Sequence, residues 1–251
     1  GSYVFDNTAP TLSSINVTSP EAGTYKAGQV VTIVATYSEN IYGTNAGAAV
    51  TSSTAPTLKI KFGTSTERTA TFSSTSGATI TYTYTIASGD NGTLATTSYS
   101  GTVYDAVGNS LSVSNKTIGG NAIVADTTAP TITVSPTSAT ACTSKSVTIT
   151  VADSGTGASG LSSSNSYQYY LSSSSTALSG GSWTTYTSGT AFTIGSGVTG
   201  TRYLFVKRVN DVVGNTSTTN GTATTISSVI YQRFGSYVFD NTAPTLSSIN
   251  V

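Results

Sequence analysis

Acidic residues are few in this chain, and several recur in short motifs at long spacing. Ten Asp and Glu residues occur in 251 positions, balanced by ten Lys and Arg. The motif D-x-T-A-P-T begins at Asp6, Asp126 and Asp240, and D-x-V-G-N begins at Asp105 and Asp211. Carboxylates are hard oxygen ligands that suit Ca²⁺, but Asp among Gly and Asn also forms turns with its own backbone. The motifs leave both kinds of chemistry open.

A longer repeat contains these motifs. Residues 1–17 and 235–251 are the same seventeen residues, without one change. A fixed long period is typical of array proteins, so the sequence predicts an excerpt of a tandem array with a period of 234 residues. The D-x-T-A-P-T motifs divide it into two predicted domains, 1–125 and 126–239, followed by 240–251 as the first strand of the next repeat.

The strand pattern predicts an all-β fold. Apolar side chains alternate with Thr, Ser or Lys in runs that include 30–38, 57–62, 79–86, 146–152 and 202–209. Alternation with period two, between turns of Gly, Ser and Asn, indicates strands with one buried face. We expect no helix in the chain.

Longer stretches carry a family resemblance. SPEAGTYKAGQVVTIVATYSENI (19–41) and TYTIASGDNGTLATTSYSGTVYDAVGN (83–109) resemble the bacterial Ig-like domains that repeat in large surface proteins and adhesins. The second half, with VTITVADSGTGASGL, RYLFVKRVNDVVGN and DNTAP, resembles a related variant. The resemblance implies two tandem Ig-like β-sandwich domains plus the first strand of a third, arranged end to end. It marks a scaffold and not an activity.

The resemblance also implies where the acids lie. In an Ig-type sandwich, the start of the first strand and the B–C and F–G loops are at the same end. The expected metal ligands of the first domain are therefore Asp6, Glu39 and Asp105. The corresponding set in the second domain, with the residue that begins the next repeat, is Asp126, Asp153, Asp211 and Asp240.

Two interpretations of these acidic poles remain open. Three carboxylates repel one another unless a cation or water screens them, so a Ca²⁺ ion at each pole is one hypothesis. Interdomain calcium is a feature of the Ig-like arrays that the chain resembles. Turn formation alone is the other hypothesis. Asp90, in SGDNG, is expected to be a turn residue.

Composition argues against several functional classes. The chain has no His and one Cys, which removes the commonest general base and any Cys/His zinc cluster, so we expect no enzyme. Zero net charge with scattered cations lacks the basic footprint of a nucleic-acid binder. No apolar run approaches the ~20 residues of a membrane span. Cys142 is expected to be a buried small hydrophobic residue.

A covalent crosslink is a further possibility. Some surface Ig-like domains form an isopeptide bond between Lys and Asn in the core. Lys59, Lys61 and Lys207 lie beside apolar residues, but the sequence identifies no acidic partner for them.

The leading functional expectation is a structural stalk or extender of an exported, extracellular surface fibre or adhesin. Its partners would be neighbouring repeats, with joints stiffened by Ca²⁺ and a long last strand over 226–239. The first alternative is an adhesive module that binds a glycan or host protein. The second is lateral self-association into a filament or surface layer. The adhesive alternative depends on aromatic residues of the second domain: Tyr167, Tyr169, Tyr170, Trp183, Tyr186, Tyr231 and Tyr237.

Overall fold

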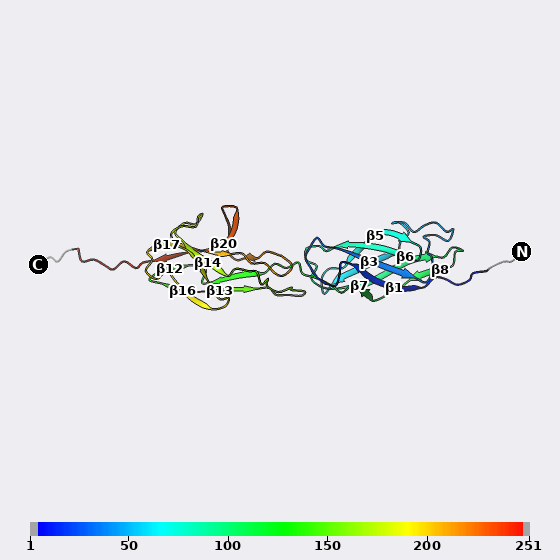
Figure 1. The fold of residues 1–251 in the computed structure, drawn as a ribbon, viewed down its shortest axis with the longest axis horizontal. Coiled ribbons are helices and arrows are strands. Elements are labelled where there is room, and N and C mark those ends of the chain that lie inside the picture. The colour runs from blue at the N-terminus through cyan, green and yellow to red at the C-terminus, as the bar shows by residue number, and fades with distance from the viewer. Residues whose placement is uncertain (1–4, 248–251) are drawn as a thin grey trace. The chain divides into compact units, whose positions relative to one another are not determined.

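The computed structural model describes residues 5–247 and divides into two compact units (Figure 1). Unit 1 comprises Gly1–Thr128 together with Gly155–Ser159, and unit 2 comprises Ala129–Ser154 together with Gly160–Val251. The described residues form strands, turns and loops without a helix, which confirms the all-β expectation. Among them there is accordingly no helix long and apolar enough to cross a membrane.

The described part of unit 1 contains ten strands. Their bounds are β1 Leu12–Ser19, β2 Gly23–Tyr25, β3 Val30–Tyr37, β4 Thr57–Phe62, β5 Arg68–Ser76, β6 Thr79–Thr85, β7 Gly92–Tyr104, β8 Ser110–Val113, β9 Ile118–Gly120 and β10 Ile123–Ala125.

The strands of unit 1 form two groups that β5 connects. One group contains β1, β3 and β6, with β9 parallel to β1. The other contains β4 and β7, with β8 and β10 beside β7 and β2 parallel to β10. β5 pairs with β4 near Arg68 and with β6 from Thr71 onward. Side chains from both groups enclose a single hydrophobic core.

The described part of unit 2 also contains ten strands. Their bounds are β11 Thr131–Ser135, β12 Ala139–Cys142, β13 Lys145–Ala152, β14 Gln168–Ser172, β15 Trp183–Thr185, β16 Ala191–Ile194, β17 Gly200–Lys207, β18 Thr218–Thr219, β19 Thr222–Ile226 and β20 Val229–Phe239.

Unit 2 is a sandwich of two sheets. The first sheet has the order β16-β13-β11-β18, and the second has the order β12-β20-β17-β14-β15 with β19 paired to β20. Figure 1 shows β13 and β16 in one layer and β14, β17 and β20 in the other. The core between them includes Ile149 from the first sheet and Leu204, Phe234 and Tyr237 from the second.

The alternation in the sequence identifies the buried faces correctly. In β3, Val31, Ile33 and Ala35 are fully buried while the intervening residues are partly exposed. Leu58 and Phe62 of β4 are buried in the same way. Because successive side chains of a strand point to opposite faces, local alternation is enough to assign these faces.

Three expectations about the second half need correction. The long last strand expected over 226–239 is present as β20 but begins only at Val229, because β19 ends at Ile226 and the chain turns back through Ser227 and Ser228. These serines have φ of 49° and 64°, the left-handed conformation that two-residue hairpin turns require. Cys142 is half-buried at the border of the core, with its Sγ 3.8 Å from the Val238 carbonyl oxygen. Of the expected strand at 240–251, the described residues 240–247 contain no strand, and 248–251 lie outside the described residues.

Candidate functional site

Unit 1 brings the three expected acids of its pole together. Asp6 precedes β1, Glu39 follows β3 and Asp105 follows β7. One carboxylate oxygen of each lies within 4.8 Å of the others. Asp105 is buried, Glu39 is half-buried and Asp6 is exposed. The strand ends that Ig-type topology places at one pole are therefore adjacent here.

Asp105 organises its own loop. Its Oδ1 accepts hydrogen bonds from the backbone N–H groups of Val107, Gly108 and Asn109 at 2.9, 2.7 and 2.8 Å. Its Oδ2 accepts one from the Asn109 side chain at 2.7 Å. Burial opposes ionisation, but the hydrogen bonds from Asn109 and the other N–H groups outweigh it and lower the pKa of Asp105. The D-x-V-G-N motif is thus a carboxylate-centred turn.

Asn109 connects this turn to the segment before β1. Its Nδ2 donates to the carbonyl oxygen of Asp6 at 3.0 Å and lies 3.5 Å from that of Thr8. Asp6 in turn accepts the Thr8 N–H at 2.9 Å. The last residue of one motif therefore holds the backbone of the other.

The acids predicted for the second pole are distributed differently between the units. Asp153 and Asp211 belong to unit 2 and have carboxylate oxygens within 4.8 Å of each other. Asp211 accepts the N–H and the side-chain amide of Asn215 at 2.7 and 2.6 Å, which repeats the turn seen in unit 1. Asp126 belongs to unit 1, where it accepts the Ser159 N–H at 2.7 Å.

Asp240 stands apart from these groups. It is exposed, and its Oδ1 accepts the Thr242 N–H at 3.0 Å. Within the residues that the structure describes, it is not part of an acidic group that could hold a metal ion.

The three carboxylates of the unit 1 pole, those of Asp6, Glu39 and Asp105, are only partly suited to bind a cation. Four hydrogen bonds already occupy the two oxygens of Asp105. Glu39 accepts no hydrogen bond from the described residues, and one oxygen of Asp6 is similarly open. Ca²⁺ takes six to eight oxygen ligands, so water or backbone carbonyls would have to complete the shell. An acidic cluster is by itself no sign of an ion.

Asp90 is a buried ionic residue and more than the turn residue expected from SGDNG. It is 0% exposed, and its Oδ1 accepts from Arg68 Nε at 2.9 Å. Its Oδ2 accepts from the Tyr84 hydroxyl at 2.6 Å and from the Ala87 N–H at 2.9 Å. The pKa of Tyr84 is raised to about 12 by burial and by this carboxylate. Asp90 therefore ties β5, β6 and the β6–β7 loop together.

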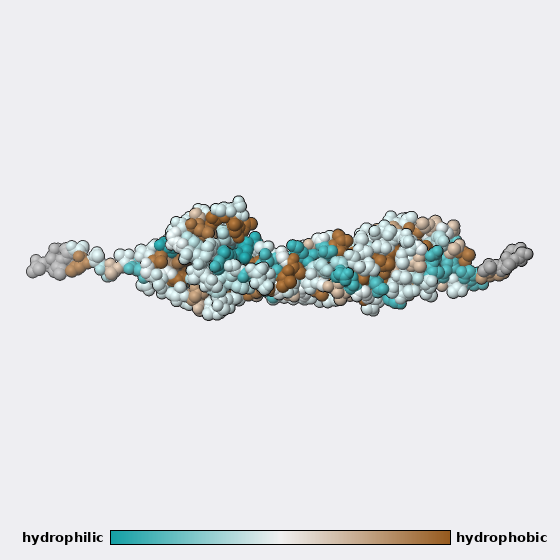
Figure 2. Space-filling model, viewed as in Figure 1, coloured by the Kyte–Doolittle hydropathy of each residue, from teal (hydrophilic) through white to brown (hydrophobic). Residues whose placement is uncertain are grey.

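The aromatic residues of unit 2 lie in two places, the hydrophobic core and a cluster around Trp183. Tyr186 and Tyr237 are buried in the core. Trp183 is half-buried, with ring centroids 5.5 Å from Tyr170 and 5.3 Å from Tyr231. Lys207 Nζ lies 5.0 Å from the Trp183 ring centroid. Figure 2 shows apolar residues gathered near the position of the β19–β20 hairpin, where Val229 and Ile230 are 48% and 43% exposed.

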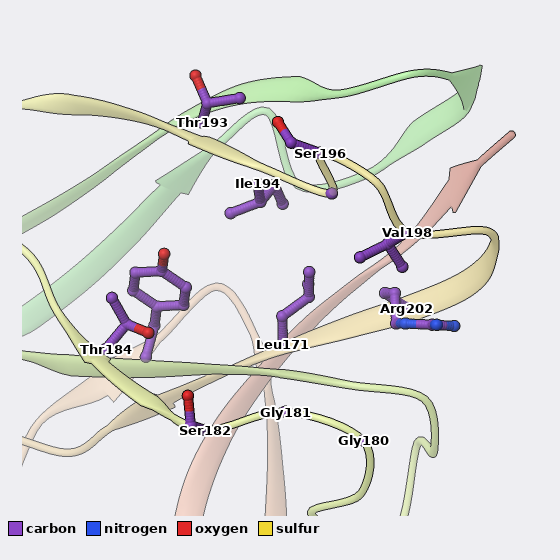
Figure 3. Close-up of a pocket in the computed structure, with 12 residues that line it drawn as sticks. Leu171, Gly180, Gly181, Ser182, Thr184, Thr193, Ile194, Ser196, Val198 and Arg202 are labelled. Atoms are coloured by element: carbon purple, nitrogen blue, oxygen red, sulfur yellow. The ribbon is translucent and has the colours of Figure 1, made fainter. Parts of the chain in front are cut away.

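A cavity of about 300 Å³ opens between the two sheets of unit 2 (Figure 3). Leu171, Ile194 and Val198 supply apolar walls, and Ser182, Thr184 and Ser196 supply hydroxyls, while Figure 3 shows the guanidinium of Arg202 at the rim, directed away from the other lining side chains. Tyr169, which also lines the cavity, stacks on Phe192 with ring centroids 4.6 Å apart.

Two of the three lysines considered for a crosslink have other partners, and the third, Lys61, is exposed. Lys59 forms an exposed ion pair with Glu67 at 2.8 Å. Lys207 donates to Gln168 Oε1 at 2.6 Å, and within the described residues it forms no ion pair with a carboxylate. Such an amide needs a Lys in the core beside an acid. Lys59 has an acid beside it but its side chain is exposed, and Lys207 has none, so this geometry gives the isopeptide hypothesis no support.

Comparisons with known proteins assign no family to the chain. No protein-family model matches it, and none of the curated proteins matches it. Among solved structures, a marsupial T cell receptor aligns over 92% of this chain and 76% of its own, with 9% identity and a TM-score of 0.35. This is a distant likeness to an Ig-domain protein, and no function follows from it.

Proposed function

We propose that this chain is an extender repeat of an exported surface fibre or adhesin, with two Ig-like sandwiches in each repeat. Its role is to supply length and stiffness in the extracellular space, and its partners are neighbouring repeats of the same chain. Two compact units and the long internal duplication support the proposal.

Complementary burial of the duplicated segment is the observation that carries this proposal. In the second copy, 235–239 ends β20 and Phe239 is 1% exposed, whereas the identical Phe5 is 84% exposed. In the first copy, Leu12 packs against the core of unit 1, whereas the identical Leu246 is 78% exposed. Among the described residues of the two copies, Phe239 is buried where Phe5 is exposed, and Leu12 contacts a core where Leu246 is exposed.

A tandem arrangement explains both exposed residues. Burying a large apolar side chain stabilises a protein by roughly 1.5–3 kcal/mol. A unit like unit 1 after residue 240 would bury Leu246, and a unit like unit 2 before residue 6 would bury Phe5. The structural repeat would then run over 6–239, which preserves the period of 234 residues seen in the sequence.

Chains of one, two and three repeats test this function. The chains are expected to be monomeric, and their length in electron micrographs is expected to increase by equal steps. At each internal joint, the residues equivalent to Phe5 and Leu246 are expected to be buried from solvent. Length that fails to grow with repeat number would contradict the proposal. Concentration-dependent lateral assembly in sedimentation would instead favour the filament or surface-layer alternative.

Calcium is a separate part of the proposal. The group of Asp6, Glu39 and Asp105 would hold Ca²⁺ beside the segment that enters unit 1, and the ion would stiffen that segment. The open oxygens of Asp6 and Glu39 support this role, while the four hydrogen bonds that Asp105 already accepts favour a purely structural turn. Removal of Ca²⁺ distinguishes the two.

An adhesive role is the second candidate, and the cavity of unit 2 favours it. Apolar walls with hydroxyl groups and an Arg suit a sugar, whose C–H faces pack on apolar surface while its hydroxyls form hydrogen bonds. A glycan array probed with the chain and with the variant Arg202→Ala tests this role. Binding that requires Arg202 would support it, and no binding would leave the extender function alone.

A further inference from the structure

The hexapeptide D-N-T-A-P-T occurs at both ends of the chain, and each copy contacts a different unit. Both copies contain the same local turn, in which the N–H of the third residue donates to the side-chain carboxylate of the first. Thr8 donates to Asp6 at 2.9 Å, and Thr242 donates to Asp240 at 3.0 Å. The two copies therefore share the same turn, although they belong to different units.

The first copy is held by the unit that follows it. Asn109 Nδ2 donates to the carbonyl oxygen of Asp6. Thr11, the last residue of the hexapeptide, exchanges hydrogen bonds with Ser38, whose hydroxyl accepts the Thr11 N–H at 2.9 Å and whose N–H donates to the Thr11 carbonyl at 3.0 Å. Within the described residues, the side chain of Asn7 takes no part in these contacts.

The second copy is held by the unit that precedes it. The Asp240 N–H donates to the Cys142 carbonyl at 3.0 Å. Asn241 Nδ2 lies within hydrogen-bonding distance of three carbonyl oxygens of unit 2, those of Thr143 at 3.0 Å, Gly195 at 3.2 Å and Val198 at 2.5 Å. These carbonyls lie in the β12–β13 and β16–β17 loops. We call them the carbonyl cup.

The two sets of contacts use different atoms of the hexapeptide. The preceding unit accepts hydrogen bonds from the N–H of the first residue and from both the side chain and the N–H of the second, since the Asn241 N–H also donates to the Thr199 hydroxyl at 3.4 Å. The following unit takes the carbonyl of the first residue and the backbone of the last. Since no donor or acceptor of the hexapeptide is used by both units, one hexapeptide can form both sets of hydrogen bonds at the same time.

The middle motif, D-T-T-A-P-T, provides an independent comparison. The Asp126 N–H donates to the Tyr25 carbonyl at 2.9 Å, as Asp240 does to Cys142. Its second residue is Thr127, whose N–H and hydroxyl both bond to Asn91 Oδ1 of unit 1, at 2.8 and 3.2 Å. The residue at the second position of each motif therefore matches the unit before it. Thr127 bonds to the side-chain amide oxygen of Asn91 in unit 1, and Asn241 bonds to the carbonyl cup of unit 2.

We propose that D-N-T-A-P-T is a two-sided hydrogen-bonded joint between repeats, in which its Asn binds the carbonyl cup of unit 2 while Asn109 of the next copy of unit 1 holds its backbone. The partner of each end is thus another copy of this repeat, and the residue after the Asp determines which unit can precede the joint. This inference rests on the proposed extender function.

Asn241→Asp in the chain as it stands tests the cup. The substitution keeps the size of the side chain, removes both N–H donors and places a carboxylate against three carbonyls. Hydrogen-exchange protection factors of the backbone amides at 240 and 241 are expected to fall about tenfold or more, because the substitution removes more than one hydrogen bond between side chain 241 and the carbonyl cup. Asn241→Thr is expected to lose part of this protection.

Asn7→Asp is the matched control, because it makes the same change in the identical hexapeptide, at the copy whose Asn side chain does not lie in a carbonyl cup within the described residues. It is expected to leave the protection factors at 240 and 241 unchanged. Equal protection in the Asn241→Asp and Asn7→Asp chains would overturn the proposal. Asn109→Ala probes the other side and is expected to lower protection of the Thr8 and Thr11 amides while leaving the amides at 240 and 241 unchanged.

A two-repeat chain, in which residues 18–251 follow Val251, separates this inference from the extender function. Spin labels on either side of the joint are expected to give a narrow distance distribution that Asn241→Asp broadens. If length doubles but Asn241→Asp changes nothing, the extender function stands and the joint is wrong. If the two-repeat chain does not lengthen, the extender function fails, whatever Asn241→Asp does to exchange.

Discussion

The hydroxyl oxygens of Tyr37 and Tyr99 lie 2.6 Å apart in the buried core of unit 1. Tyr82 extends the pair, with its hydroxyl 3.1 Å from that of Tyr99 and donating to the Pro56 carbonyl at 2.7 Å. Burial disfavours each phenolate, raises the pKa of Tyr37 to about 12, and raises those of Tyr82 and Tyr99 as well. These three hydroxyls are a polar chain that must remain protonated.

Unit 1 is therefore expected to lose stability at alkaline pH. Because the folded state raises these pKa values, their stabilising contribution is complete below the unfolded value of about 10 and is lost as pH rises from there through about 12. Urea unfolding midpoints measured between about pH 8 and pH 12 check this. Tyr99→Phe is expected to flatten the dependence, and a constant midpoint across this range would contradict it.

Asp90→Ala is expected to lower the free energy of unfolding of unit 1 by about 3 kcal/mol. The change leaves the Tyr84 hydroxyl and the Arg68 guanidinium without their buried acceptor. Thermal unfolding followed by circular dichroism measures the effect. Glu67→Gln is the control, because the Lys59–Glu67 pair is exposed on both sides and its loss should leave the melting temperature unchanged. Equal effects of the two substitutions would refute the structural role of Asp90.

Gly157→Ala is expected to displace the loop Gly155–Ser159 from unit 1. Gly157 has φ of +81°, and a Cβ there would collide with the Ala125 carbonyl and the Gly92 backbone. Exchange of the Ser159 amide, which donates to Asp126, reports the displacement.

Gly155→Ala provides the comparison for Gly157→Ala. Gly155 also has positive φ, +121°, but a Cβ there meets no atom within 4 Å. The two variants therefore share the backbone strain and differ in the collision. If both increase Ser159 exchange equally, close packing at Gly157 is not what positions the loop.

Calcium is expected to raise the melting temperature of the chain in the millimolar range, and EDTA to reverse the rise, since extracellular sites bind with Kd of about 10⁻⁴–10⁻³ M. Glu39→Gln is the sharpest variant, because Glu39 accepts no hydrogen bond from the described residues and its loss should affect only the ion. The calcium effect should diminish in Glu39→Gln. If EDTA changes nothing in the unaltered chain, these carboxylates are turn formers.

The sequence alone determined the all-β class, the buried faces of strands such as β3 and the recurrence of the acidic motifs. Each depends on local information, since a period of two assigns a face whatever the strand packs against. The convergence of Asp6, Glu39 and Asp105 also followed from the sequence, because the resemblance to Ig-like domains supplied the topology.

Tertiary structure decided the partners of these residues. Asp90 in SGDNG looks like any turn Asp, and its burial depends on Arg68, which lies 22 positions earlier on strand β5. Asn7 and Asn241 are the same residue in the same hexapeptide, yet only Asn241 lies against three carbonyls. A side chain's type and neighbours in sequence define which hydrogen bonds it can form, but only the packed loops of distant strands define which of them it does form.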